Sequence, residues 1–289
     1  MVLYRDYPLK EFTTVKIGGK SRCFFSPKNV NELLEYLPRL VQDYQIFILG
    51  GGSNTIFGNF KGCVISTQTL RGFSIKKKTK EWIELEIFGG TPLKDLIKLS
   101  VSGNWSGLEG LFGIPRITFG GAVAMNASAY SFEIGKLVKE VRFIDLNTLE
   151  ENIDSAPRFG YRSSPYRGGA IIISTRLRLY KSQSSVRETI RNLNFRRKKS
   201  QPLTLPTAGS TFKNPLGFFA GKLLEEVGLK GYCTSKGLCF SKKHANFMVN
   251  ISKRATLEDV YELTNLAKER VFKTFGVVLE EEVQLVGEV

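Results

Sequence analysis

The chain has 289 residues, 42% of them hydrophobic, and 42 Lys and Arg against 27 Asp and Glu give it a formal net charge of +15. This length supports a sizeable core and predicts two or three subdomains rather than one. No apolar run reaches the length of about 18 residues that a membrane span needs, and the N-terminus lacks the basic and apolar blocks of a secretory signal.

The basic charge would attract polyanions, but no motif for RNA or DNA binding accompanies the clusters at 76–78 and 196–199. We therefore expect a phosphorylated small molecule as partner rather than nucleic acid. The single histidine, His244, excludes a metal site with two histidine ligands. Any proton chemistry must then involve Ser, Glu, Lys, Tyr or Cys.

The cysteines are scattered through apolar or strand-like stretches and form no CxxC pair; they are Cys23, Cys63, Cys233 and Cys239. This pattern predicts buried free thiols rather than disulfides or a metal site, and it favours a cytoplasmic protein.

In chain order, apolar spacing predicts a helix over 31–40 and a second that Thr91 caps, Pro92 opens and Gly103 stops. Apolar or alternating runs predict strands in the first two thirds of the chain, at 46–49, 63–66, 82–88, 137–146 and 169–179.

The last third begins with a helix over 183–200 that ends in basic residues, and a loop follows at 207–217. Thr256 and Asp259 have the spacing of a capping box, which predicts the start of a long helix. The remaining predictions are a helix at 217–228, a strand at 245–251 and a closing strand at 277–286. Helices and strands are mixed throughout and no repeat is present, so the predicted fold class is α+β.

Two segments rich in small residues suit a phosphate-bearing ligand. GGGSN at 50–54 follows a strand, and consecutive glycines let backbone N–H groups approach a bulky anion. The alternative is a tight turn. The second segment, 113–130, contains Gly120, Gly121 and Ala122, and its alternative is close helix packing. Two such segments in one chain favour an extended cofactor with a diphosphate.

Three further stretches carry polar side chains that suit a reaction centre. In FGYRSSPY, Arg162 can contact a carboxylate or charge developing on oxygen, although this stretch by itself favours a surface arginine. In TAGSTFKNPL, Ser210 lies beside small residues and before Lys213 and Asn214, as a placed proton donor or a surface turn residue would. In LEEEVQLVG, Glu280 and Glu282 share one face of the expected strand. The alternative interpretation of this stretch is a solvated edge strand without a chemical role.

Eight segments in order give the chain a resemblance to the UDP-N-acetylenolpyruvoylglucosamine reductases, or UDP-N-acetylmuramate dehydrogenases, of bacterial peptidoglycan synthesis. It resembles their shorter form, which lacks an extra substrate-covering loop. The segments are FTTVKIGG, LGGGSN, GLEGLFGIP, GGAVAMNASAY, FGYRSS, AGSTFKNP, KHANFMVN and FGVVLEEEVQLVG.

The resemblance implies a two-part FAD-binding domain of the vanillyl-alcohol-oxidase type, at 1–66 and 67–182, and a C-terminal α+β substrate domain at 183–289 whose last strand can return to the first part. FAD would be bound without a covalent link. NADPH would reduce it, and the enzyme would then convert UDP-N-acetylglucosamine enolpyruvate to UDP-N-acetylmuramate. A cytoplasmic monomer with a UDP-sugar substrate, no nucleic-acid partner and no membrane span is expected.

The resemblance also assigns roles. Ser210 would protonate the carbanion, while Arg162 and Glu282 would stabilise the enolate. The residues matched to the substrate are Tyr161, Lys199, Lys213 and Asn214. Those matched to the cofactor are Gly50, Gly51, Gly52, Ser53, Asn54, Arg116, Gly120, Gly121, Ala122, Asn126 and Ala127. No metal ligand is expected.

The sequence departs from the family pattern in three places: Arg116 replaces the last residue of GIPG, Ser128 and Ser131 replace glycines of MNAGAYG, and residues 235–237 replace a GGA triplet. Two rival functions remain open. A sugar or alcohol oxidase of the same superfamily would need neither AGSTFKNP nor LEEEV, and a nucleic-acid-binding protein would bind no flavin.

Overall fold

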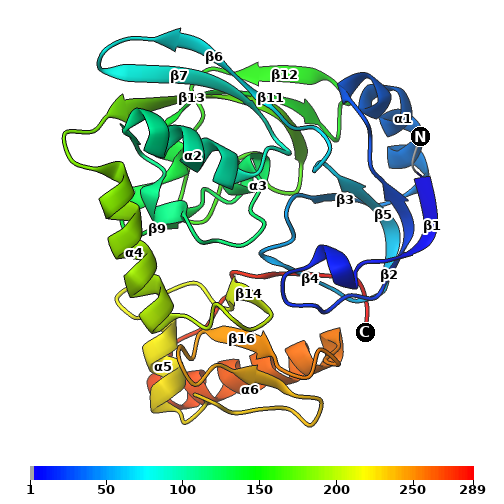
Figure 1. The fold of residues 1–289 in the computed structure, drawn as a ribbon. Coiled ribbons are helices and arrows are strands. Elements are labelled where there is room, and N and C mark those ends of the chain that lie inside the picture. Colours follow the sequence, from blue (N-terminus) through cyan, green and yellow to red (C-terminus); the bar gives the residue numbers. More distant parts are fainter. Residues whose placement is uncertain (1–2) are drawn as a thin grey trace. The chain divides into compact units, whose positions relative to one another are not determined.

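The computed structural model describes residues 3–289, and these form two compact units (Figure 1). The first unit contains 23–51 and 62–196, together with the start of the chain as far as Arg5. The second contains Asp6–Arg22, Gly52–Lys61 and Arg197–Val289. Each unit mixes helices and strands, so the predicted α+β class is confirmed.

A four-stranded sheet has the order β1-β2-β5-β3. Its strands are β1 (Leu3–Pro8), β2 (Lys20–Phe25), β5 (Phe60–Ser66) and β3 (Ile46–Leu49). Helix α1 (Val30–Asp43) buries Leu33, Leu37 and Leu40 in a cluster that also includes Phe25 and Ile65. The apolar period that predicted this helix therefore marks the face that it buries.

A six-stranded sheet forms the centre of the first unit, in the order β12-β11-β13-β7-β6, with β8 also paired to β13. Its strands are β12 (Glu151–Asp154), β11 (Val138–Asp145), β13 (Ala170–Lys181), β7 (Trp82–Phe88), β6 (Phe73–Lys78) and β8 (Trp105–Ser106). Strand β7 alternates buried and half-buried residues, so one of its faces contributes to the core. Helices α2 (Leu93–Gly103) and α3 (Phe119–Ala124) pack their apolar residues into the same hydrophobic core as the buried face of β7.

Short elements connect these parts. The hairpin β9 (Ser128–Ala129) and β10 (Phe132–Glu133) follows α3, and helix α4 (Val186–Ser200) follows β13. The single helical turns are η1 (Lys10–Phe12), η2 (Glu109–Leu111) and η3 (Ile134–Lys136).

The second unit contains a three-stranded sheet in the order β14-β16-β15 and a parallel pair of strands, β17 and β4. The strands are β14 (Thr207–Ser210), β16 (Phe247–Asn250), β15 (Leu238–Phe240), β17 (Gln284–Val286) and β4 (Thr55–Phe57). Helices α5 (Ala220–Glu226) and α6 (Leu257–Phe275) enclose a core with them, and its largest buried rings are Phe212 and Phe240.

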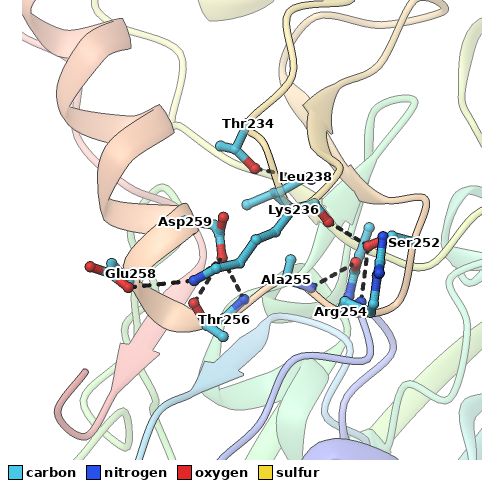
Figure 2. Close-up of polar contacts among 10 residues, drawn as sticks. Thr234, Lys236, Leu238, Ser252, Arg254, Ala255, Thr256, Glu258 and Asp259 are labelled. Carbon is cyan, nitrogen blue, oxygen red and sulfur yellow. Dashed lines mark hydrogen bonds and ion pairs between the residues drawn. The ribbon is translucent and has the colours of Figure 1, made fainter.

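The first turn of α6 confirms the predicted capping box (Figure 2). A carboxylate oxygen of Asp259 accepts hydrogen bonds from the Thr256 N–H at 2.8 Å and from the Thr256 hydroxyl at 2.7 Å. Figure 2 shows Lys236 reaching the same turn, where its ammonium lies 3.5 Å from Glu258 and 3.7 Å from Asp259. The helix start is therefore fixed by hydrogen bonds within one turn and by two ion pairs from Lys236, which lies about 20 residues earlier in the chain.

Several local predictions are wrong. Thr91 does not cap α2, because its hydroxyl is bonded to Gly72. The helix does end at Gly103, as predicted, and Asn104 follows as its C-cap with φ 53°. The expected loop at 207–217 begins as strand β14, because β16 provides a pairing partner. The closing strand covers only Gln284–Val286, and Glu281 makes one isolated bridge to Phe212.

The prediction of free thiols is also wrong. Cys23 is bonded to Cys63, and Cys233 to Cys239. The first pair joins the neighbouring strands β2 and β5, and the second lies across an isolated bridge. Strand pairing brings these residues together, and the sequence spacing does not reveal it. In a separate finding, no helix within residues 3–289 combines the length and the apolar character that a membrane crossing requires.

Candidate functional site

The glycines that follow β3 leave no room for side chains. A Cβ at Gly50 would lie 2.5 Å from the Thr118 hydroxyl, and one at Gly51 would lie 1.6 Å from the Arg116 carbonyl oxygen. In the second unit, Gly52 has φ 66°, and its Cβ would lie 1.8 Å from the Phe12 carbonyl oxygen. Only glycine tolerates both the contact and the left-handed backbone at this last position.

The second small-residue segment packs directly against the first within the first unit, since residues 116–118 are the ones that approach Gly50 and Gly51. Gly120 also approaches the neighbouring backbone, and its N–H donates to the Gly89 carbonyl at 2.7 Å. At Gly121 a Cβ would meet only the Thr118 hydroxyl, at 3.1 Å. Close packing therefore explains Gly120, whereas Gly121 leaves space beside the backbone.

The other predicted cofactor residues occupy varied positions. Arg116 is exposed and has φ 55°, a conformation that glycine adopts at lower cost. Ala122 and Ala127 are buried, and Ser53 is half-buried. Asn54, in the second unit, donates from its side chain to the Glu282 carbonyl at 3.0 Å.

The turn from Gly160 to Ser163 carries the predicted Tyr161 and Arg162. Its end residues exchange two backbone hydrogen bonds, of 3.0 and 3.2 Å. Arg162 has φ 53°, which is costly for a residue other than glycine and occurs disproportionately at functional sites. Its guanidinium carbon lies 5.7 Å from the centre of the exposed Tyr161 ring. Its Nη1 donates to both the carbonyl and the hydroxyl oxygen of Ser128, each at 2.9 Å.

Asn126, predicted to contact the cofactor, is 1% exposed and ties this turn to the β9–β10 hairpin. Its amide nitrogen donates to the Gly160 carbonyl at 2.8 Å and to the Glu133 carboxylate at 2.9 Å. Its amide oxygen accepts from the Gly135 N–H at 3.0 Å. The side chain thus acts as a buried clamp on the segment that positions Arg162.

Ser210 ends strand β14, opposite Phe247 of β16. Gly209, just before it, has φ 83° and turns the chain in a way that other residues resist. The Ser210 side chain is half-buried, and within residues 3–289 its hydroxyl makes no hydrogen bond. A hydroxyl in this setting remains able to donate to a bound molecule.

A second asparagine holds the segment after Ser210. Asn246 is 4% exposed; its amide oxygen accepts from the Phe212 N–H at 2.9 Å and its amide nitrogen donates to the Phe212 carbonyl at 2.8 Å. The Thr211 N–H also donates to the Asn246 carbonyl at 2.7 Å. Sequence reasoning did not single out Asn246, although an asparagine within the apolar run at 245–251 was a signal of a buried amide that needs partners.

Glu282 lies beside the same segment, because its N–H donates to the Thr211 carbonyl at 2.8 Å. The two preceding acids form ion pairs with lysines: Glu280 with Lys213, and Glu281 with Lys268 at 2.5 Å. The structure therefore brings Ser210 and Glu282 onto adjoining segments of the second unit.

The residues matched to the nucleotide have several local roles. Asn214 accepts from the Ala220 N–H at 3.0 Å and so caps the start of α5, while Lys213 pairs with Glu280. The basic cluster at 196–199 does not form one surface. Arg197 is buried and bonded to Gln201, whereas Lys199 is exposed.

The only histidine of the sequence is poorly suited to carry a charge. Burial lowers the pKa of His244, and nearby Lys230 lowers it further, while Glu225 acts in the opposite direction. Its Nδ1 accepts from the Asn246 N–H at 3.3 Å, and its ring lies 4.9 Å from that of Phe247. A neutral, packed imidazole fits a structural role.

Two parts of the chain match models of known protein families. A family model described as "FAD binding domain" matches residues 21–148, and one described as "UDP-N-acetylenolpyruvoylglucosamine reductase, C-terminal domain" matches 201–286. The chain thus combines a flavin-binding domain with the second domain of a particular reductase.

Relatives extend this finding to the whole chain. The chain is 42% identical, over 99% of its length and 96% of the relative's, to a UDP-N-acetylenolpyruvoylglucosamine reductase of Aquifex aeolicus. The chain is also 40% identical to a UDP-N-acetylenolpyruvoylglucosamine reductase of Caldicellulosiruptor saccharolyticus, over 98% of this chain and 92% of the relative. The crystal structure of the Thermus caldophilus reductase matches with a TM-score of 0.79 and 29% identity, over 99% of this chain and 100% of that one. The chain belongs to the UDP-N-acetylenolpyruvoylglucosamine reductase family.

Proposed function

We propose that the protein reduces UDP-N-acetylglucosamine enolpyruvate to UDP-N-acetylmuramate, with NADPH as reductant and FAD as cofactor. FAD, when bound, supplies the transfer of a hydride from NADPH to the terminal vinyl carbon of the substrate. Family membership over nearly the full chain supports the overall reaction. One observation supports a joint role for Ser210 and Glu282, namely the hydrogen bond from the Glu282 N–H to the Thr211 carbonyl next to Ser210. The role of Arg162 rests on the family resemblance.

The first unit offers backbone suited to the diphosphate of FAD. Gly50 and Gly51 carry no side chain where residues 116–118 pack onto them, and Gly121 leaves free space beside its own backbone. Backbone N–H groups at such positions can approach an anion closely. We assign diphosphate binding to these glycines, with Gly52, Ser53, Asn54 and Arg116 as further contacts.

The flavin is expected to be bound without a covalent link. All four cysteines form disulfides, and His244 is half-buried with its ring packed against Phe247. Neither residue type is therefore available as a nucleophile for flavin attachment. After denaturation in acid, all of the yellow colour should stay in the supernatant.

Addition of hydride to the vinyl carbon leaves negative charge on the carbon that bears the carboxylate. Ser210 donates a proton to that carbon, so that a hydride and a proton together saturate the double bond. Arg162 and Glu282 stabilise the enolate, which needs hydrogen-bond donors aimed at its oxygens. For Glu282 this role requires the protonated acid, and a neighbouring negative charge favours that form.

We assign substrate binding to Tyr161, Lys199, Lys213 and Asn214, and we keep the division into FAD-binding parts at 1–66 and 67–182 and a substrate domain at 183–289. A cytoplasmic monomer that does not bind nucleic acid completes the proposal. Arg and Lys neutralise diphosphates, so UDP should be essential for recognition of the sugar.

The test separates the two half-reactions. Stopped-flow absorbance follows flavin reduction by NADPH and, separately, reoxidation by the enolpyruvyl substrate. Ser210→Ala should leave the first rate within about 2-fold and reduce the second by roughly 10²-fold or more, because a chemical participant is lost rather than one ordinary hydrogen bond. Equal slowing of both steps would remove Ser210 from the mechanism. A protein without flavin, or one oxidised only by other acceptors, would overturn the reaction itself.

A further inference from the structure

We infer that Ser128 is a positioning residue for Arg162: its hydroxyl fixes the guanidinium in the orientation that enolate stabilisation requires. This inference rests on the proposed function, because it gives Ser128 a role only through Arg162.

Both N–H groups of one guanidinium nitrogen of Arg162 are engaged by Ser128. Nη1 carries two N–H groups, and two acceptors lie 2.9 Å away, the Ser128 carbonyl and the Ser128 hydroxyl. One acceptor alone would allow the planar group to swing about its hydrogen bond. Two acceptors on one residue restrict that rotation, and charge-assisted hydrogen bonds of this kind are stronger than neutral ones.

Ser128 is itself held firmly. It pairs with Glu133 across the β9–β10 hairpin, whose two connecting residues, Tyr130 and Ser131, have φ 52° and 70°. Positive φ at both positions matches a type I′ turn, which fixes the register of a two-residue hairpin. The hairpin therefore presents the Ser128 hydroxyl from a defined position.

The hairpin and the turn of Arg162 are also tied together. Asn126 donates to Glu133 on the hairpin and to Gly160 at the start of the turn. The backbone of Arg162 and its side-chain acceptor thus share one buried clamp. What remains adjustable is the long side chain, and the Ser128 hydroxyl limits that remaining freedom.

The experiment compares Ser128→Ala and Ser128→Thr, with Ser131→Ala as the matched control. Ser131 lies in the same hairpin, and within residues 3–289 its side chain makes no hydrogen bond. Ser128→Ala should lower kcat of the enolpyruvyl half-reaction roughly 10-fold, the effect of one charge-assisted hydrogen bond, with KM and NADPH-driven flavin reduction within about 2-fold. Ser128→Thr, which keeps the hydroxyl, should restore most of the rate, and Ser131→Ala should leave it unchanged.

A second readout does not depend on activity. In protein labelled with ¹⁵N-arginine, the Nη1 protons of Arg162 should exchange slowly in the wild type and in Ser128→Thr, and fast in Ser128→Ala. Wild-type kcat and unchanged exchange in Ser128→Ala would overturn the inference, as would an equal effect from Ser131→Ala.

A failure of the proposed function can be distinguished from a failure of the inference about Ser128 by comparing Arg162→Ala with Ser128→Ala. If Arg162→Ala itself left the enolpyruvyl half-reaction intact, the role of Arg162 would be wrong, whatever Ser128→Ala did. If Arg162→Ala abolished that step while Ser128→Ala did not change it, only the inference would fail. In an Arg162→Ala background, Ser128→Ala should have no further effect, because the two residues act as one unit.

Discussion

The segments that carry Arg162 and Ser210 are positioned in different ways. Arg162 lies on a two-residue turn, and both its backbone and its guanidinium depend on side chains, Asn126 and Ser128. Ser210 lies at the end of a strand, and Asn246 binds the backbone of Phe212 two residues further on. No side chain within residues 3–289 holds the Ser210 hydroxyl.

The difference follows from side-chain length. Serine has one side-chain torsion, so a fixed backbone fixes its hydroxyl to within a few rotamers. Arginine has several torsions and loses more rotamer entropy when it is ordered, so it needs contacts at its far end as well. A buried asparagine can fix either backbone, but only the arginine needs a further acceptor.

Replacing Arg162 with lysine should produce the largest change. Lysine keeps the charge but loses the planar fork, so it cannot reproduce the orientation set by Ser128. Enolpyruvyl reduction should fall roughly 10²–10³-fold, with NADPH oxidation nearly unchanged. Ser210→Cys, by contrast, should retain part of its activity, because a thiol on the same backbone still donates a proton. Stopped-flow traces that rank these two variants in the opposite order would break the comparison.

Asn246→Ala should mainly affect stability. It removes two hydrogen bonds and leaves the buried N–H and carbonyl groups of Phe212 without that partner, so we expect a loss of about 2–4 kcal/mol. Denaturant titration measures it. Asn246→Asp keeps an acceptor for the Phe212 N–H but faces the Phe212 carbonyl with a second acceptor, and it serves as the comparison variant. A loss below about 0.5 kcal/mol for Asn246→Ala would show that strand pairing alone positions Ser210.

Acid should weaken the second unit through Asp259. Burial raises the pKa of this carboxyl, but hydrogen bonds from Thr256 and Thr234 and the charge of Lys236 outweigh it, so the pKa is below its ordinary value. A lowered pKa means that the charged form stabilises the fold above the unfolded value of about 3.9, and that this contribution is lost as the pH falls through the folded value.

The charged form of Asp259 should stabilise the second unit by about 1 kcal/mol, the typical contribution of a helix cap. This stabilisation should be lost below about pH 4. Asp259→Asn should remove this part of the pH dependence. Both tryptophans, Trp82 and Trp105, belong to the first unit, so their fluorescence follows that unit, while circular dichroism also follows α6. An identical acid profile for Asp259→Asn and wild type would contradict the assignment.

Ser131→Gly should give the smallest change, and a favourable one. Ser131 has φ 70°, where glycine avoids steric cost, so we expect stabilisation of about 0.5–1 kcal/mol. Thermal unfolding measures this gain, and activity should be unchanged because the hairpin register is kept. A less stable Ser131→Gly would mean that backbone entropy outweighs the strain.

Much of the local structure could be predicted from the sequence. The helix at 31–40 appears within α1, and the capping box of α6 forms as Thr256 and Asp259 indicate. Both depend on residues three or four apart, whose spacing the sequence shows directly. For the glycines at 50–52 the sequence indicated an anion site or a tight turn, whereas the packing of Gly51 and Gly52 against the Arg116 and Phe12 carbonyls became visible only in the structure.

Tertiary structure alone decided the contacts between distant residues. The sequence places a loop at Ser210, but pairing with Phe247 makes it the end of a strand, and the cysteines pair because their strands are neighbours. Ser128 and Arg162 are 34 positions apart, and the Asn246 amide reaches Phe212 over the same separation. No periodicity records such pairs, because buried polar groups take whichever partners the folded chain brings within hydrogen-bonding distance.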